Sequence, residues 1–124
     1  MFRRLFAIIL IMLSFGIKIA FADNYQTIHK IIPHIDQPDK KVELYILKPK
    51  IEEKLPVVIY THGFQHPERP GAKASIDNGT LVSFVNQGYL AVGVSQPGFG
   101  NSDGPADFSG PYTQRAIIVD GGGN

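Results

Sequence analysis

A serine flanked by glycines is the first pattern in this sequence that could carry chemistry. Residues 100–104 read GNSDG, which matches G-x-S-x-G with Ser102 at the centre. In enzymes that attack with a serine, this string forms a tight turn between a strand and a helix. Here residues 96–101 separate Ser102 from Ser95 at the end of the preceding predicted strand, and Pro105 and Gly110 oppose a helix directly after Ser102. The spacing predicts that Ser102 lies in a glycine-rich loop; a nucleophilic Ser102 is kept as the alternative.

The histidines offer the residue types of a metal site, but their spacing does not favour one. His62 and His66 are four residues apart, which suits two ligands on a helix, and Pro67 and Pro70 oppose a helix there. The other two are interpreted as solvated loop residues: His29 and His34, near Asp36 and Asp39. The chain has no cysteine, which excludes disulfides and zinc–cysteine sites. We expect no metal and no cofactor.

Two apolar segments with a helix between them must position any site. Residues 57–61 are continuously apolar or β-branched, which predicts a strand buried on both faces of a sheet, and residues 89–94 repeat the pattern. Residues 81–87 have a helical apolar face, and Gly88 follows where a C-terminal cap is wanted. Strand, loop, helix and strand form a βαβ unit, so the sequence predicts an α/β fold with a partly parallel sheet.

The flanking segments predict further elements. An edge strand is expected around residues 26–32, and residues 42–47 alternate with Val42, Leu44 and Ile46 on one side, which indicates a half-exposed strand. Residues 62–78 and 95–111 are rich in turn formers and are expected to be loops. A last helix is expected over residues 113–120, ended by the glycines at 121–123.

Two segments together carry a family resemblance. LPVVIYTHGFQ at residues 55–65 and QPGFGNSDG at residues 96–104, separated by the βαβ unit, resemble the α/β-hydrolase superfamily. The nearest likeness is to dienelactone-hydrolase-like and prolyl-oligopeptidase-like serine hydrolases, over roughly residues 40–115. Gln96 and Pro97 depart from the pattern, because acidic and basic residues often stand at these places in the family.

The resemblance implies a role for the loop after the first buried strand. Serine hydrolases stabilise a tetrahedral oxyanion with two backbone N–H groups, one of them from this loop. By resemblance, the amide of Phe64 would be that donor, and His62 would brace the loop by hydrogen bonding without acting as a base. Gly63 is expected to let the backbone turn sharply without a Cβ clash. The alternative is that His62-Gly63 is merely a turn at the end of a strand.

The resemblance also implies that part of the fold is missing. In this family the nucleophile, acid and histidine follow the fifth strand. We therefore expect a truncated α/β-hydrolase fold: a lead-in segment at residues 23–40 and an incomplete domain at residues 41–124. Such a chain would be inactive alone against esters or peptides. It would also be marginally stable and able to self-associate through an unpaired sheet edge.

The first 22 residues are typical of a secretory signal peptide. Arg3 and Arg4 precede an apolar run at residues 5–17, and Ala20 and Ala22 stand two apart before Asp23. A basic start, a short apolar stretch and small residues at the cleavage site define such a segment. We expect cleavage at Asp23 and a periplasmic or secreted product that contacts a membrane only through this segment. The alternative is an uncleaved anchor at residues 5–22.

The charge of the chain limits the classes of partner that are expected. Without residues 1–22, nine basic residues face eleven acidic ones and no basic block remains, so a nucleic-acid partner is not expected. Two functions are consistent with the sequence. The first is a fragment of an exported serine hydrolase acting on esters or peptides. The second is a small non-catalytic envelope or membrane-anchored binding protein.

Overall fold

The computed structural model describes residues 24–65 and 69–122 of the chain. Within these residues the strands are β1 (Tyr25–Pro33), β2 (Lys41–Pro49), β3 (Val57–Thr61) and β4 (Leu90–Val94). They form a single sheet in the order β1-β2-β4-β3. β2 is antiparallel to both β1 and β4, whereas β3 and β4 are parallel. The predicted α/β class with a partly parallel sheet is confirmed at this level.

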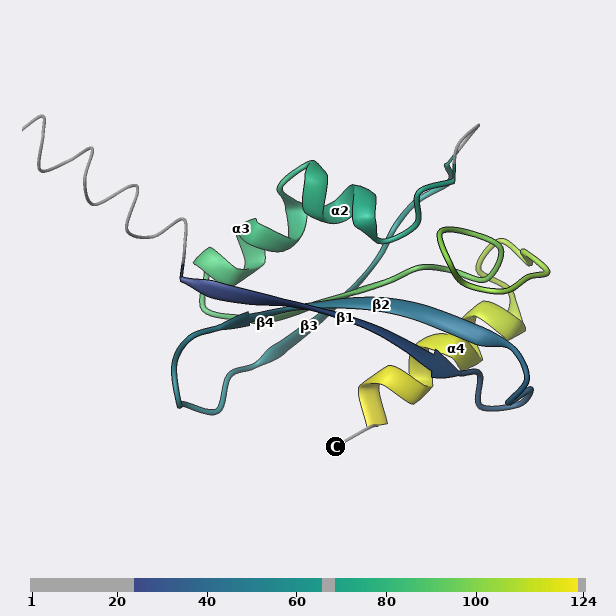
Figure 1. The fold of residues 1–124 in the computed structure, drawn as a ribbon, viewed down its shortest axis with the longest axis horizontal. Helices are drawn as coiled ribbons and strands as arrows, with labels where there is room; N and C mark the ends of the chain where they lie inside the picture. Colours follow the sequence, from purple (N-terminus) through teal and green to yellow (C-terminus); the bar gives the residue numbers. More distant parts are fainter. Residues whose placement is uncertain (1–23, 66–68, 123–124) are drawn as a thin grey trace, which may run out of the picture.

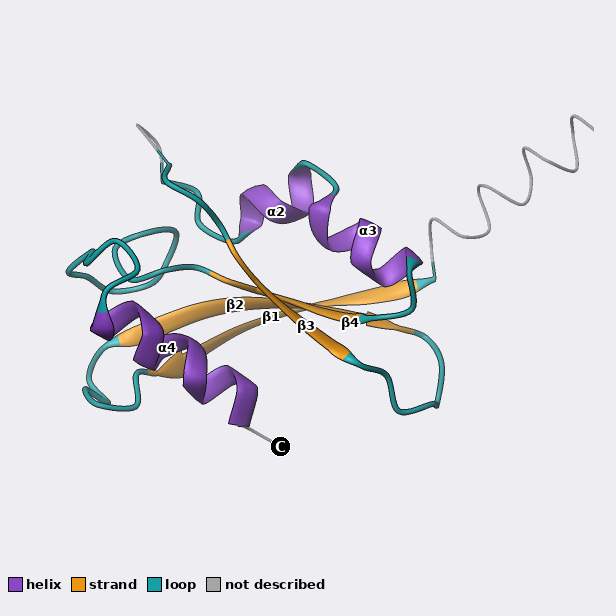
Figure 2. Cartoon of the chain, turned by 180° about the vertical axis from the view of Figure 1, so that it is seen from behind, coloured by secondary structure: helices purple, strands orange, loops and turns teal. Residues whose placement is uncertain are grey.

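Helices cover both faces of the sheet. The described residues form α2 (Lys73–Asp77), α3 (Thr80–Asn86) and α4 (Pro111–Gly122). α2 and α3 lie over one face and α4 lies over the other, as two opposite views show (Figure 1, Figure 2). None of the helices in this part of the chain is long and apolar enough to cross a membrane. The predicted signal peptide and its cleavage site lie outside the described residues.

The core has two halves, one on each face of the sheet. Alternate side chains of a strand point to opposite faces, so neighbouring strand residues enter different halves. The half between α4 and the sheet contains the buried apolar residues Val42, Leu44, Val92, Val94 and Ala116. The half between α3 and the sheet contains Leu47, Leu81, Val85 and Ala91.

The predicted βαβ unit is confirmed, with one element that the sequence did not indicate. Val57 pairs with Leu90, and the parallel register runs to Thr61 and Val94. α3 lies between these strands in the chain, close to the predicted residues 81–87. α2 was missed because it is only five residues long and has no side-chain cap, so its sequence resembles the surrounding loop.

The burial predicted for two strands is wrong. β3 was expected to be buried on both faces, but it is an edge strand with Val57 56% exposed. An apolar run does not by itself distinguish a central strand from an edge strand. β2 was expected to be half-exposed, but Val42, Glu43 and Leu44 are all buried, because the loop after β4 covers Glu43. β1 agrees with the predicted edge strand, so the lead-in segment is part of the sheet.

The last helix is longer than predicted at both ends. Pro111 starts it, since the first position needs no N–H donor. The Asp107 carboxylate accepts hydrogen bonds from the backbone N–H of Tyr112 at 2.8 Å and of Thr113 at 3.2 Å. The helix ends at Gly122, so the glycine run does not stop it at once. Glycine costs a helix only about 1 kcal/mol per residue relative to alanine.

Candidate functional site

The carboxyl ends of the two parallel strands bring the candidate residues together. β3 is followed by His62 and β4 by Ser95 and Gln96. Because β3 and β4 are adjacent and parallel, both ends lie at the same border of the sheet (Figure 1). In open α/β sheets ligands bind outside the carboxyl ends of the strands. This border is therefore where a site is expected on topological grounds.

His62 is a bracing residue. Its side chain is buried, Nδ1 donates to the Gly63 carbonyl at 2.8 Å, and Nε2 accepts from the Gln96 backbone N–H at 3.0 Å. These partners fix the neutral Nδ1–H tautomer, because a carbonyl can only accept and an amide N–H can only donate. Burial lowers the pKa of His62 below its usual value, and the Gly63 carbonyl opposes this only in part. With both nitrogens engaged, the ring ties β3 to β4 and is not placed as a base.

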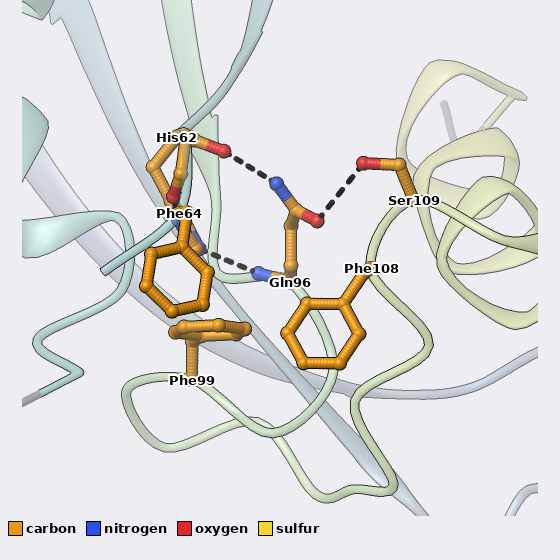
Figure 3. A pocket seen from close by; sticks show the side chains of 7 residues that line it. His62, Phe64, Gln96, Phe99, Phe108 and Ser109 are labelled. Carbon is orange, nitrogen blue, oxygen red and sulfur yellow. Dashed lines mark hydrogen bonds between the residues drawn. The ribbon is translucent and has the colours of Figure 1, made fainter. Parts of the chain in front are cut away.

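Gln96 links the loop after β4, to which it belongs, to the loop after β3 and to the segment that precedes α4. Its side-chain Nε2 donates to the His62 carbonyl, and its Oε1 accepts from the Ser109 hydroxyl at 3.5 Å (Figure 3). In sequence Gln96 stood out only as a departure from the family pattern. No spacing rule links it to Ser109, which lies beyond the glycine-rich loop.

A cavity of about 280 Å³ opens at these strand ends. It is called the strand-end cavity here, and its lining residues are His62, Gly63, Phe64, Gln96, Phe99, Phe108 and Ser109. Figure 3 shows three phenylalanine rings gathered beside Gln96. The cavity thus combines an apolar wall with a few fixed polar groups, which is typical of small-molecule sites.

The rings of this cavity differ in exposure. Phe99 is buried, with the His62 ring edge-on at 5.0 Å and the Arg69 guanidinium over its ring at 5.0 Å from the centroid. Phe64 and Phe108 are 73% and 63% exposed, and their ring centroids are 6.2 Å apart. Sequence reasoning missed Phe99 and Phe108, since nothing in their spacing along a loop indicates that they meet.

The predicted oxyanion loop lines this cavity, but the reason given for its glycine is wrong. His62, Gly63 and Phe64 all contribute to the lining. Gly63 does not have a positive φ, and a Cβ built on it would meet no atom within 4 Å. The turn after β3 is therefore compatible with a larger residue at this position. Its conformation is held instead by the hydrogen bonds of His62.

Ser102 has a structural position. Its hydroxyl donates to the Ser95 carbonyl at 2.6 Å and accepts from the Glu43 backbone N–H at 2.8 Å. The side chain is buried and does not line the strand-end cavity. No histidine contacts it within the described residues, whereas a serine nucleophile needs an oriented base within hydrogen-bond reach. The prediction that Ser102 sits in a loop agrees with this geometry.

A buried carboxylate organises the residues around Ser102. Glu43 is 1% exposed and accepts from His29 Nε2 and the Ser95 hydroxyl, both at 2.8 Å. It also accepts from Asn101, through the backbone N–H at 3.1 Å and through Nδ2 at 2.5 Å. The Ser95 hydroxyl in turn accepts from the Ala72 N–H at 2.8 Å. Glu43, His29, Ser95 and Asn101 are called the Glu43 cluster below.

The Glu43 cluster stabilises a charge inside the protein. Burial alone would raise the pKa of Glu43, but the hydrogen bonds from Asn101, Ser95 and His29 outweigh it, so this pKa lies below its usual value. Gly100 makes the close packing possible. It has φ +53°, and a Cβ there would lie 2.5 Å from Glu43 Oε1. Gly100, the first glycine of the G-x-S-x-G string, therefore leaves room for the Glu43 carboxylate.

The interpretation of His29 and His34 as solvated loop residues is wrong in one respect for each: His34 follows β1 in a loop but is buried, and His29 is exposed but belongs to a strand. His34 is 1% exposed, hydrogen-bonds the Tyr112 carbonyl at 2.9 Å and stacks on the Tyr112 ring. His29 lies in β1, stacks on Tyr45 across the sheet and reaches Glu43. A histidine near acidic residues in sequence gives no indication of such distant partners.

No candidate metal site is found among residues 24–65 and 69–122, where no three histidine or acidic side chains are grouped to hold an ion. His66 lies outside the described residues. Comparison of the sequence with protein-family models gives no match. Comparison with curated proteins gives no match either.

Proposed function

We propose that this chain supplies the oxyanion-binding part of an exported serine hydrolase that acts on esters or peptides. The observation that carries this proposal is the position of residues 62–64. They follow a parallel strand, and they line a cavity shared with the loop after the neighbouring strand. An oxyanion donor in such enzymes comes from the loop after the third strand.

Preorganisation of that loop supports the same function. An oxyanion donor is effective because it is held in place before charge develops. His62 is buried and bonded at both ring nitrogens, and Gln96 bonds its carbonyl. The amide of Phe64, two residues after His62, is the proposed donor.

The catalytic groups themselves are not assembled in the described part of the chain. There, no serine hydroxyl is bonded to a histidine, and Ser102 and Ser95 are both engaged in the interior. On this proposal, the nucleophile, the acid and the histidine come from other residues. We expect the purified chain alone to hydrolyse no p-nitrophenyl ester above buffer and to take no fluorophosphonate label.

The proposed location is the periplasm or the exterior. It rests on the signal-like sequence of residues 1–22. Mass spectrometry of the chain expressed in a Gram-negative host should give an N-terminus at or near Asp23. An intact Met1 or Phe2 in the membrane fraction would support the anchored alternative.

The decisive experiment starts from the DNA downstream of this coding sequence. A Val/Ile-rich strand followed directly by G-x-S-x-G and a helix, in any reading frame, is expected there. In the product extended to include it, Phe64→Pro removes one amide N–H and should lower kcat about 10²–10³-fold. Phe64→Ala keeps that N–H and is the control. Downstream DNA without such a strand and turn, or equal kcat in both variants, would refute the proposed function.

One observation favours a non-catalytic binding protein as the second candidate. The described residues leave the outer edge of β3 unpaired, and its five residues contain neither charge nor proline. Such an edge is a template for pairing with another chain. Sedimentation should then show a concentration-dependent dimer, which Val57→Lys abolishes and Lys30→Ala, on the other edge strand, leaves intact.

A further inference from the structure

The strand-end cavity contains the only exposed aromatic rings among the large hydrophobic side chains described. Those exposed are Ile31, Ile35, Ile51, Val57, Phe64, Phe108 and Ile118. The two phenylalanines come from different loops, yet both line this cavity and lie 6.2 Å apart. Leaving such a side chain in water forgoes about 1.5–3 kcal/mol of burial energy. A ligand that covers both rings would recover part of it.

The backbone turn that carries one of these rings is anchored to its neighbours. Phe108 and Ser109 have φ of +49° and +68°, a region that residues with side chains seldom adopt. The Ser109 carbonyl accepts a hydrogen bond from Gln114 Nε2 at 3.0 Å. The Ser109 hydroxyl donates a hydrogen bond to Gln96 Oε1. The turn is thereby anchored to α4 on one side and to the loop after β4 on the other. Phe108 is thus held at the cavity by its neighbours.

The polar groups of the cavity select the ligand's chemistry. Among the described residues that line it, none is acidic or basic apart from His62, which is neutral. Gln96 and Ser109 are the neutral hydrogen-bonding side chains in the lining. The nearby cation, Arg69, is engaged over Phe99 and with the Gly98 carbonyl at 3.2 Å. Gln96 Nε2 has a second hydrogen besides the one that it donates to the His62 carbonyl, so a neutral ligand with a carbonyl group suits this lining better than a charged one.

We propose that the strand-end cavity binds a flat aromatic group that carries a neutral carbonyl substituent, as in an aromatic ester or amide. The paired rings of Phe64 and Phe108 form one wall, against which the aromatic group packs, and Gln96 and Ser109 face its substituent. Aromatic pairs contribute beyond the area they bury, so flatness is what the site selects. As a statement about substrate this rests on the proposed function, whereas binding is measurable with this chain alone.

The test compares two esters that share one skeleton. Methyl 2-naphthoate is flat, and methyl decahydro-2-naphthoate is its saturated, puckered counterpart. Titrations of the purified chain, followed by amide chemical shifts, should give binding of the flat ester about tenfold tighter. The largest shifts should fall on residues 62–64 and 108–109. Equal affinity for both esters, or shifts spread over the sheet edge, would overturn the inference.

Variants distinguish a site that selects a flat aromatic group from non-specific binding to exposed apolar side chains. Phe64→Leu and Phe108→Leu keep apolar bulk and should each weaken the flat ester about fivefold while leaving the saturated ester unchanged. Ile51→Ala removes an exposed apolar side chain outside the cavity and should change neither. Equal weakening by Ile51→Ala, or none by the leucine variants, would contradict the proposed site.

The two proposals fail in different ways. Selective binding of the flat ester by a chain whose downstream DNA encodes no nucleophile would uphold this inference and refute the hydrolase. An extended, active hydrolase that binds and cleaves the two esters equally would uphold the enzyme and refute the aromatic site.

Discussion

The Glu43 cluster and the strand-end cavity both use residues of the loop that follows β4, but they use polar residues in opposite ways. In the cluster, Glu43 accepts four hydrogen bonds and is closed from solvent. In the cavity, a single braced histidine stands beside two exposed rings. The residue types best suited to catalysis are in the closed site. A carboxylate and a serine are thus not evidence of a functional site unless open space adjoins them.

The largest expected effect comes from removing the carboxylate. Glu43→Ala leaves the buried Ser95 hydroxyl and the part-buried Asn101 backbone N–H without their acceptor, and it opens a cavity. We expect the free energy of unfolding to fall by about 3–4 kcal/mol, measured by urea denaturation. Glu52→Ala, which removes an exposed carboxylate from a loop, should change it by less than about 0.5 kcal/mol. A loss below about 1 kcal/mol for Glu43→Ala would show that the cluster does not support the fold.

The pH dependence of the free energy of unfolding should reveal the contribution of the Glu43 carboxylate. The pKa of Glu43 is lower in the folded chain than its usual value of 4.5, so the folded state binds fewer protons than the unfolded state. Its stabilisation is present above that usual value and is lost as the pH falls through the folded pKa. The free energy of unfolding should therefore fall more steeply between about pH 5 and pH 3 in the wild type than in Glu43→Gln.

Part of the acid dependence should remain in Glu43→Gln. The pKa of Asp107 is also lowered, because the hydrogen bonds from Thr113 and the Tyr112 amide outweigh its burial. Asp107→Asn in addition to Glu43→Gln should flatten the profile further. Identical profiles for the wild type and Glu43→Gln would contradict the charged state assigned to Glu43.

Ser102→Ala should lower the free energy of unfolding by less than Glu43→Ala does. It removes hydrogen bonds to the Ser95 carbonyl and the Glu43 N–H, and we expect a loss of about 1–2 kcal/mol in the free energy of unfolding. Labelling by a fluorophosphonate should be absent before and after the substitution. Stoichiometric labelling of the wild type that disappears in Ser102→Ala would make this serine a nucleophile and reverse the contrast between the two sites.

Much of the fold could be predicted from local patterns. The continuous apolar runs at residues 57–61 and 89–94, and the helical face between them, correctly predicted a parallel βαβ unit. Burial could not be predicted as well, because it depends on which strand is central. β3 and β4 have similar compositions, yet β4 pairs on both sides and β3 on one.

The site divides in the same way. Residues 62–64 were named from a family resemblance, in which the loop directly after a strand carries the oxyanion donor, and that motif is local in sequence. Gln96, Phe108 and Ser109 were missed because their loops meet only after the sheet has formed. Glu43 was missed for a related reason. An acidic residue in an alternating strand is normally assigned to the solvent side, and here a distant glycine-rich loop covers it.

The smallest expected change in the free energy of unfolding is at the strand-end cavity, and it tests most directly how the cavity differs from the Glu43 cluster. Phe108→Asn removes an exposed ring, and asparagine adopts positive φ more readily than phenylalanine does. We expect the free energy of unfolding to change by less than about 0.5 kcal/mol, because most of the ring is already in water. Phe99→Ala, at the buried ring under Arg69, should instead cost about 3 kcal/mol. If Phe108→Asn also cost more than about 1 kcal/mol, the exposed rings would be part of the structural core, and the cavity would resemble the Glu43 cluster in kind.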